Sequence, residues 1–105
     1  MNIELVMHDL SSFQRDLLVV VAGLDNPIGK DIHEELEAYY PERVTAGRVY
    51  PQLTELVEKQ LITKEELDGR TNIYQISRRG IRELQDRREW VNSYIAPFDE
   101  LSADR

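Results

Sequence analysis

The 105-residue chain contains no cysteine and only two histidines, His8 and His33. Without cysteine it has no disulfide framework, no thiolate metal site and no thiol-based redox sensor. A metal site would have to rely on carboxylates, and no spacing here resembles one, so we expect neither a metal nor another cofactor. His33 has acidic neighbours on a predicted helix, and we expect it to be a solvated surface side chain.

Long hydrophobic runs are also missing. No apolar run approaches the roughly 20 residues that cross a bilayer, and the start lacks the basic region and cleavage site of a signal peptide. We therefore expect a cytoplasmic protein with no membrane partner, folded as one domain around a single core. The chain also lacks a nucleophile–base pair with supporting spacing and a glycine-rich phosphate loop, so an enzyme is the least expected class.

Positive charge is scarce overall but unevenly distributed. The chain has 13 basic and 20 acidic residues, a net charge of −7, with three Lys against ten Arg. This composition resembles the surface of a protein from a high-salt cytoplasm, although an acidic mesophilic protein is the alternative. Residues 43–82 hold eight basic and five acidic side chains, a net of +3, and the remainder holds five and fifteen, a net of −10. This segment is the one part of the chain suited to phosphate.

Three helices are predicted after an ambiguous N-terminal extension, residues 1–10. Ser11 and Gln14 match a capping box, and the apolar stripe that follows ends at Gly23. The second helix is predicted over about 29–40, because Pro41 stops the pattern. The third begins at Thr45, whose hydroxyl is expected to cap it. Two helices separated by a few residues indicate a helix-turn-helix.

The third helix has one apolar face, with Val49 and Leu53 at helical spacing. We expect Thr45, Arg48 and Gln52 to line an exposed ridge. Arg and Gln carry the paired hydrogen-bonding groups that match the major-groove edges of G and A. An exposed Arg on a helix is nevertheless more often solvated and idle, so its context must support a role in binding.

A β-hairpin is predicted next, from strands at 62–67 and 70–76 around Asp68-Gly69. Asp-Gly is the preferred two-residue hairpin turn, in which both residues take positive φ. Arg70 lies beside the tip, where it could reach phosphate or the minor groove. The alternative is an ordinary polar turn. Residues 11–77 would then form one winged-helix domain.

The last long helix is predicted over 78–95, capped by Ser77 and followed by an acidic tail, 96–105, with Phe98 as its anchor. Its apolar positions follow steps of three and four, as in a coiled-coil seam. We favour a dimerisation helix over a fourth core helix, because little of the domain is left for it to cover. The candidate interface residues are Ile81, Leu84, Arg88, Val91, Tyr94 and Ile95.

The segment Arg48 to Leu56, RVYPQLTEL, and the following KQLI at 59–62 resemble the recognition-helix signature of PadR-like transcriptional regulators. Tyr74 to Gly80 resembles that family's second wing strand and the cap of its final helix. Tyr50-Pro51 is the most specific element, because an interior Pro costs a helix about 3 kcal/mol. Tyr50 either packs near the helix bend or contacts phosphate through its hydroxyl.

The resemblance implies a mostly α fold with a small β-hairpin, a winged helix-turn-helix with an added C-terminal dimerisation helix. It implies a homodimeric, sequence-specific repressor that places its third helix in the major groove of double-stranded operator DNA and its wing on the flanking backbone, with half-sites about one turn apart. A winged-helix protein-interaction module without DNA binding is the alternative. A small-molecule effector stays open, because the chain ends soon after one C-terminal helix. The candidate DNA-binding residues are Thr45, Arg48, Gln52, Arg43, Tyr50 and Arg70.

Overall fold

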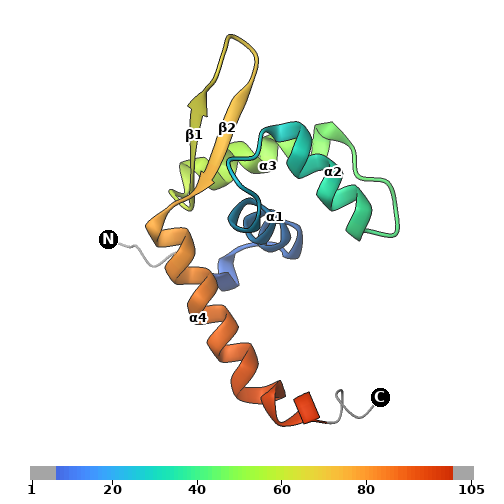
Figure 1. Cartoon of the computed structure of the whole chain (residues 1–105), viewed down its shortest axis with the longest axis vertical. Coiled ribbons are helices and arrows are strands. Elements are labelled where there is room, and N and C mark those ends of the chain that lie inside the picture. Colours follow the sequence, from blue (N-terminus) through green and yellow to red (C-terminus); the bar gives the residue numbers. More distant parts are fainter. Residues whose placement is uncertain (1–6, 101–105) are drawn as a thin grey trace.

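The computed structural model describes residues 7–100, which form helices around a core with a projecting hairpin. In chain order the elements are η1 (Met7–Asp9), α1 (Ser12–Gly23), α2 (Gly29–Tyr39), α3 (Ala46–Glu58), β1 (Ile62–Glu66), β2 (Asn72–Ile76), α4 (Arg78–Ile95) and η2 (Ala96–Phe98). Helices α1 to α3 pack together, the hairpin projects from them, and α4 leads away on the other side (Figure 1). The expected winged helix with a C-terminal helix is confirmed.

The N-terminal half of the core is built on α1. Its predicted capping box is present, because Gln14 N–H donates to Ser11 Oγ over 3.1 Å and Ser11 N–H donates to Gln14 Oε1 over 3.0 Å. Leu17 and Leu18 of α1 are fully buried, and each such side chain stabilises the fold by about 1.5–3 kcal/mol. Met7 and Leu10, in the segment expected to be an extension, are also buried in this core.

The link between α2 and α3 is held by two side chains of α2. His33 Nε2 lies 2.5 Å from the carbonyl oxygen of Val44, and Glu37 Oε2 accepts from Val44 N–H over 3.2 Å. The expectation that His33 is a solvated surface residue is therefore wrong. The pattern of its helix could not reveal this partner, which lies eleven residues along the chain.

Helix α3 starts and ends on backbone hydrogen bonds. Thr45 occupies the N-cap, but its hydroxyl makes no capping hydrogen bond, contrary to prediction, because the N–H groups of Arg48 and Val49 both donate to its carbonyl. Gln60 takes a left-handed conformation with φ 65°, and Leu61 N–H closes back on Leu56 O over 3.1 Å. This is the hydrogen-bonded helix ending that usually uses Gly.

The hairpin loop is longer than predicted. The last strand pair is Glu66 with Asn72, which leaves residues 67–71 in the loop. The prediction of a two-residue turn with positive φ at both positions is wrong, since no glycine among the described residues has positive φ. Instead Asp68 Oδ1 accepts from the N–H groups of Arg70 and Thr71, each over 3.0 Å, and these bonds lower the pKa of the Asp68 carboxyl.

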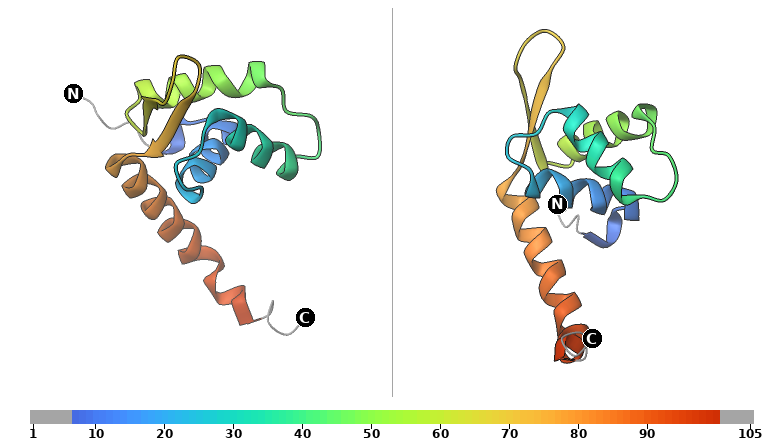
Figure 2. Two further views of the ribbon diagram at one scale, coloured as in Figure 1. Left: turned by 45° about the horizontal axis from the view of Figure 1, so that its top comes forward. Right: turned by 45° about the vertical axis from the view of Figure 1, so that its right-hand side comes forward.

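Helix α4 begins in a tight joint against the end of α3. Ser77 Oγ accepts from Gly80 N–H over 3.0 Å, as predicted for a cap, and also lies 2.9 Å from the carbonyl oxygen of Leu61. A Cβ on Gly80 would stand 2.2 Å from that same carbonyl oxygen, so only Gly fits. Beyond this joint α4 extends away from the other helices in both further views (Figure 2).

Candidate nucleic-acid interface

The open face of α3 is opposite Val49, Leu53 and Leu56, which are fully buried. Helical spacing of three and four places the following exposed residues on that open face: Gly47, Tyr50, Pro51, Thr54 and Glu58. The predicted ridge of Thr45, Arg48 and Gln52 therefore flanks the open face and does not form its centre. Three residues of this face, Gly47, Pro51 and Thr54, have small side chains, so another molecule can approach the helix backbone closely beside them.

Gln52 is turned toward α1. It is half-buried, and its Oε1 accepts a hydrogen bond from Nε2 of the buried Gln14 over 2.9 Å. Paired reading of adenine needs the amide oxygen and nitrogen together. In this conformation one of the two acceptor sites of the Gln52 amide oxygen is occupied and the side chain is half-buried, so Gln52 is less exposed than the predicted ridge requires.

Arg48 is exposed and is held by rings rather than by a carboxylate. Its guanidinium carbon lies 3.9 Å from the centroid of the Phe13 ring and 5.9 Å from that of Tyr40. Within residues 7–100, Arg48 has no ion pair with an acidic side chain. Arg43 and Thr45 are exposed just before it, so three of the predicted residues lie together at the start of α3.

A cleft of about 260 Å³ lies between the start of α2, α3 and the hairpin. It brings together two predicted residues, Tyr50 and Arg70, and adds Lys30 of α2. A Cβ on Gly29 would stand 2.4 Å from Tyr50 Cε1, so the missing side chain lets the Tyr50 ring lie against α2. Burial is the main cause that raises the pKa of Tyr74, which also lines the cleft, and the nearby Tyr50 raises it further. The Tyr74 hydroxyl therefore stays protonated.

Lys30 was missed by the sequence patterns, although a signal for it exists. A basic side chain in the first turn of a helix opposes the positive end of the helix dipole. Lys30 is the second residue of α2, where helix stability favours an acid. A residue type that the helix itself disfavours at its position points to a role outside the helix.

The positive region is smaller than the charge count suggested. Arg78, Arg79 and Arg82 stand on the first turns of α4, which leads away from the hairpin (Figure 1). Without them, residues 43–77 carry five basic and five acidic side chains, a net of zero. Glu55 and Glu58 lie in the second half of α3, so positive charge concentrates at the start of α3 and in the cleft.

Comparison with known proteins identifies the family. The model of the transcriptional regulator PadR-like family matches residues 17–86. The chain belongs to the PadR-like family. Among solved structures, this PadR-like protein is similar to H. salinarum RosR grown from NaBr, with 39% identity, a TM-score of 0.79, and coverage of 91% of this chain and 93% of that chain. It is also similar to RosR in the hsRosR-S1 complex, with 39% identity, a TM-score of 0.80, and 92% coverage of each chain.

The family and these structures show that the protein is a transcriptional regulator. They are also consistent with the halophile origin that the acidic, lysine-poor composition predicts. No curated protein matches the chain. Among residues 7–100 no helix is long and apolar enough to cross a membrane. In the same range, no group of three or more His, Asp or Glu side chains could hold a metal ion.

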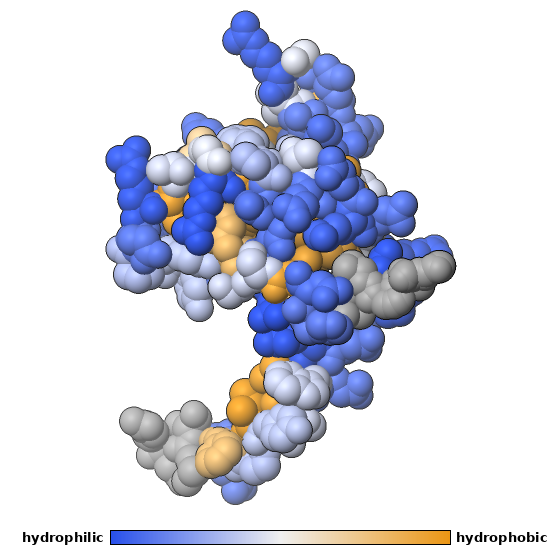
Figure 3. Space-filling view, turned by 180° about the vertical axis from the view of Figure 1, so that it is seen from behind, coloured by the Kyte–Doolittle hydropathy of each residue, from blue (hydrophilic) through white to orange (hydrophobic). Residues whose placement is uncertain are grey.

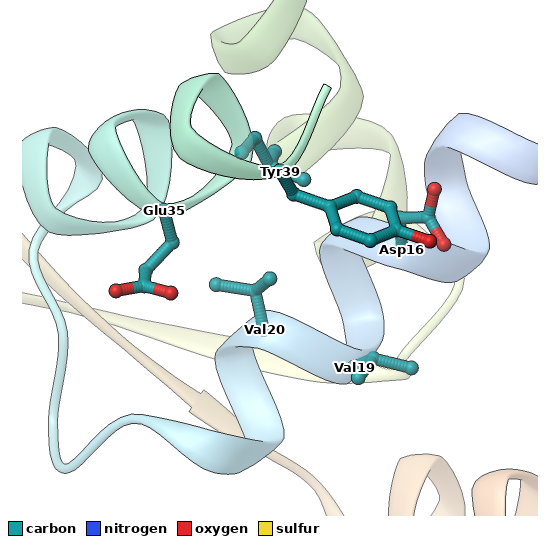
Figure 4. A pocket seen from close by; sticks show the side chains of 6 residues that line it. Asp16, Val19, Val20, Glu35 and Tyr39 are labelled. Carbon is teal, nitrogen blue, oxygen red and sulfur yellow. The ribbon is translucent and has the colours of Figure 1, made fainter. Parts of the chain in front are cut away.

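The PadR-like chain has a second pocket, of about 340 Å³, between α1 and α2. Figure 4 shows Val19 and Val20 on α1 facing Glu35 and Tyr39 on α2. The two charged side chains that line it, Asp16 and Glu35, are both acidic. Because carboxylates repel phosphate, these two side chains do not favour nucleic-acid binding in this pocket.

The outer part of α4 exposes a large apolar surface in this PadR-like protein. Figure 3 shows hydrophobic residues gathered toward its far end. Leu84 differs from the other predicted interface residues, since it packs against the core of its own domain. Phe98 is 58% exposed, so its expected role as an anchor is wrong. Of the predicted interface residues, Val91 is half-buried, and four are exposed: Ile81, Arg88, Tyr94 and Ile95. Two further aromatic residues, Trp90 and Phe98, are exposed on the same part of the chain.

Proposed function

We propose that this PadR-like regulator binds DNA sequence-specifically as a homodimer and acts as a repressor. The start of α3 enters a major groove, and the hairpin lies on the flanking backbone. The observation that carries the proposal is the cleft in which Lys30, Tyr50 and Arg70 converge beside the open face of α3. The major groove of a DNA duplex admits an α-helix, and its base edges lie between two phosphate backbones. A helix with an open face and cations beside it fits that arrangement.

Each side chain has a proposed contact. Lys30 and Arg70 bind phosphate oxygens from opposite sides of the cleft, with the Tyr50 hydroxyl between them. Arg48 donates to a guanine edge or to phosphate at the start of α3. Arg43 and Thr45 add contacts at the same end, and Gln52 contributes its NH₂ group and the second acceptor site of its amide oxygen.

The homodimer is supported by the apolar surface of α4. Trp90 and Tyr94 pack edge to face with ring centroids 5.4 Å apart, and they are 56% and 66% exposed. Contiguous exposed apolar surface of this kind marks an interaction site. Two α4 helices paired about a two-fold axis cover it and present two recognition helices to one duplex. A dimer seated on two half-sites excludes other proteins from that DNA, and this steric effect is the basis for proposing repression.

Fluorescence anisotropy tests the proposal with a duplex that the wild-type protein enriches from a random-sequence library. We expect the protein to bind this duplex, and the DNA upstream of its own gene, with higher affinity than random DNA. The comparison is made at a salt concentration where the protein is folded. Lys30→Ala should weaken binding to all sequences alike and lower the slope of log K against log salt by about 1. Lys59→Ala is the matched control, because Lys59 pairs with Glu55 over 3.9 Å at the far end of α3. Equal affinity for selected and random DNA would refute sequence-specific binding.

A winged-helix module that binds another protein is the second candidate. The pocket between α1 and α2 favours it, because Val19 and Tyr39 there are 54% and 75% exposed beside two carboxylates. The same anisotropy titration separates the two functions. A protein that binds no duplex at any salt concentration at which it is folded supports the interaction module.

A further inference from the structure

We infer that Phe13 and Tyr40 are positioning residues of the DNA interface, an aromatic shelf that holds the Arg48 guanidinium in place at the start of α3. This inference rests on the proposed DNA binding and deepens it. Nothing in the sequence pattern connects the three residues, because Phe13 reads as a core position of the first helix and Tyr40 as the end of the second.

The shelf is built from three helices. Phe13 lies in the first turn of α1 and is 5% exposed, whereas Tyr40 is the C-cap of α2 and is half-buried. Their rings meet edge to face, with centroids 5.6 Å apart and an interplanar angle of 79°. Arg48 of α3 places its guanidinium carbon 3.9 Å from the Phe13 centroid. A cation above a ring face at this distance is attracted by the ring quadrupole.

The Tyr40 ring is itself fixed. Its hydroxyl donates to Asp16 Oδ2 of α1 over 2.5 Å. Burial, followed by this hydrogen bond, raises the pKa of Tyr40 to about 12, so the hydroxyl stays a donor at neutral pH. The Asp16 carboxylate therefore engages Tyr40, and no ion pair with an acidic side chain of residues 7–100 draws Arg48 away from the rings.

A restrained arginine binds better than a free one. Arg has many rotamers, and immobilising such a side chain at an interface costs part of the binding free energy. Because the shelf orders the Arg48 side chain when the protein folds, less side-chain entropy is lost when DNA binds. Among residues 7–100 the Arg48 guanidinium donates no hydrogen bond, so its N–H groups stay available for the forked hydrogen bonds that Arg makes to phosphate or guanine.

A double-mutant cycle tests the shelf with the same selected duplex and fluorescence anisotropy. In the protein with Arg48, Tyr40→Leu and Phe13→Leu should each weaken binding by about 2- to 10-fold, the ordering cost of one long side chain. In the Arg48→Ala background the same substitutions should change affinity by less than about 2-fold, because no guanidinium is left to position. Leu24→Ala is the matched control, since Leu24 is, like Tyr40, a partly buried side chain packed against the core, and it caps the end of α1 opposite Phe13. It should leave affinity unchanged in both backgrounds.

Circular dichroism and thermal melting establish that each variant is folded, and Tyr40→Leu keeps the test decisive if the buried Phe13 cannot be replaced. Equal loss of affinity with and without Arg48 would show that the rings act on the fold alone and would overturn the inference. If Arg48→Ala itself leaves affinity unchanged while Lys30→Ala weakens it, DNA binding stands and the shelf has no role in it. If the wild-type protein enriches no duplex, the proposed function fails before the shelf is tested.

Discussion

Replacing Gly47 by Ala should raise the stability of the protein and lower its affinity for DNA. Gly47 is the second residue of α3, on its open face, and a Cβ built there meets only Thr45 Oγ1, at 4.0 Å. Its φ is not positive, so Ala adopts the same backbone. Exchanging Gly for Ala within a helix stabilises it by about 0.5–1 kcal/mol.

The added methyl group changes the face that is proposed to enter the major groove. Fitting an extra methyl into a closely packed contact costs about 1–3 kcal/mol, which corresponds to about a 5- to 150-fold loss of affinity. The two effects have opposite signs. A general folding defect lowers both quantities together, so it cannot produce this combination.

Thermal or denaturant unfolding and fluorescence anisotropy on the selected duplex measure the two effects on the same preparation. Gly23→Ala is the matched control, because a Cβ there also meets open space and Gly23 ends α1, away from the open face of α3. It should leave affinity unchanged. If Gly47→Ala binds DNA as tightly as the wild type, the open face of α3 does not approach DNA closely.

Four further predictions concern other parts of the molecule. Gln60→Gly should raise the free energy of unfolding by about 1 kcal/mol, because Gly carries no penalty at φ 65°; no change on denaturant unfolding would contradict this. Val91→Glu should put charge into the apolar surface of α4 and yield monomers with poor affinity, whereas an unchanged dimer mass by light scattering would refute that interface. The log–log salt slope of DNA binding should be shallower than the number of basic residues suggests, because the acidic flanks take up cations near DNA, and an ordinary steep slope would count against this. The folded-state pKa of Tyr40, about 12, exceeds its ordinary 10.0, so its contribution is complete below pH 10 and lost as pH rises from 10 toward 12; Tyr40→Phe should abolish this part of the alkaline loss of stability, and an unaltered pH profile would disprove it.

The elements that depend on near neighbours in sequence were predictable. The Ser11–Gln14 capping box, the end of α2 before Pro41 and the Ser77 cap of α4 all rest on residues within a few positions of each other. Local hydrogen bonding and helical periodicity decide such features, so the fold class followed from them.

The errors arise where a side chain finds a distant or competing partner. Gln52 is bound by Gln14, 38 positions earlier, so periodicity alone placed it on an exposed ridge. His33 bonds a carbonyl in the following link. In the hairpin, the Asp68 side chain bonds the loop backbone, which replaced the expected turn. The cleft with Lys30 was missed because it needs three elements brought together in space.

In the proposed dimer, the joint at the start of α4 would fix the distance between the two α3 helices. Ser77 bonds the carbonyl of Leu61, and Gly80 packs so tightly on that carbonyl that even a methyl group does not fit. The direction of α4 relative to α3 is therefore set by backbone contact and not by a flexible linker. A dimer joined through α4 would therefore hold its two α3 helices at a fixed distance along the duplex. Each base pair inserted between the two half-sites turns one of them by roughly 35° about the DNA axis. Such a dimer would select operators by the spacing of their half-sites as well as by their sequence.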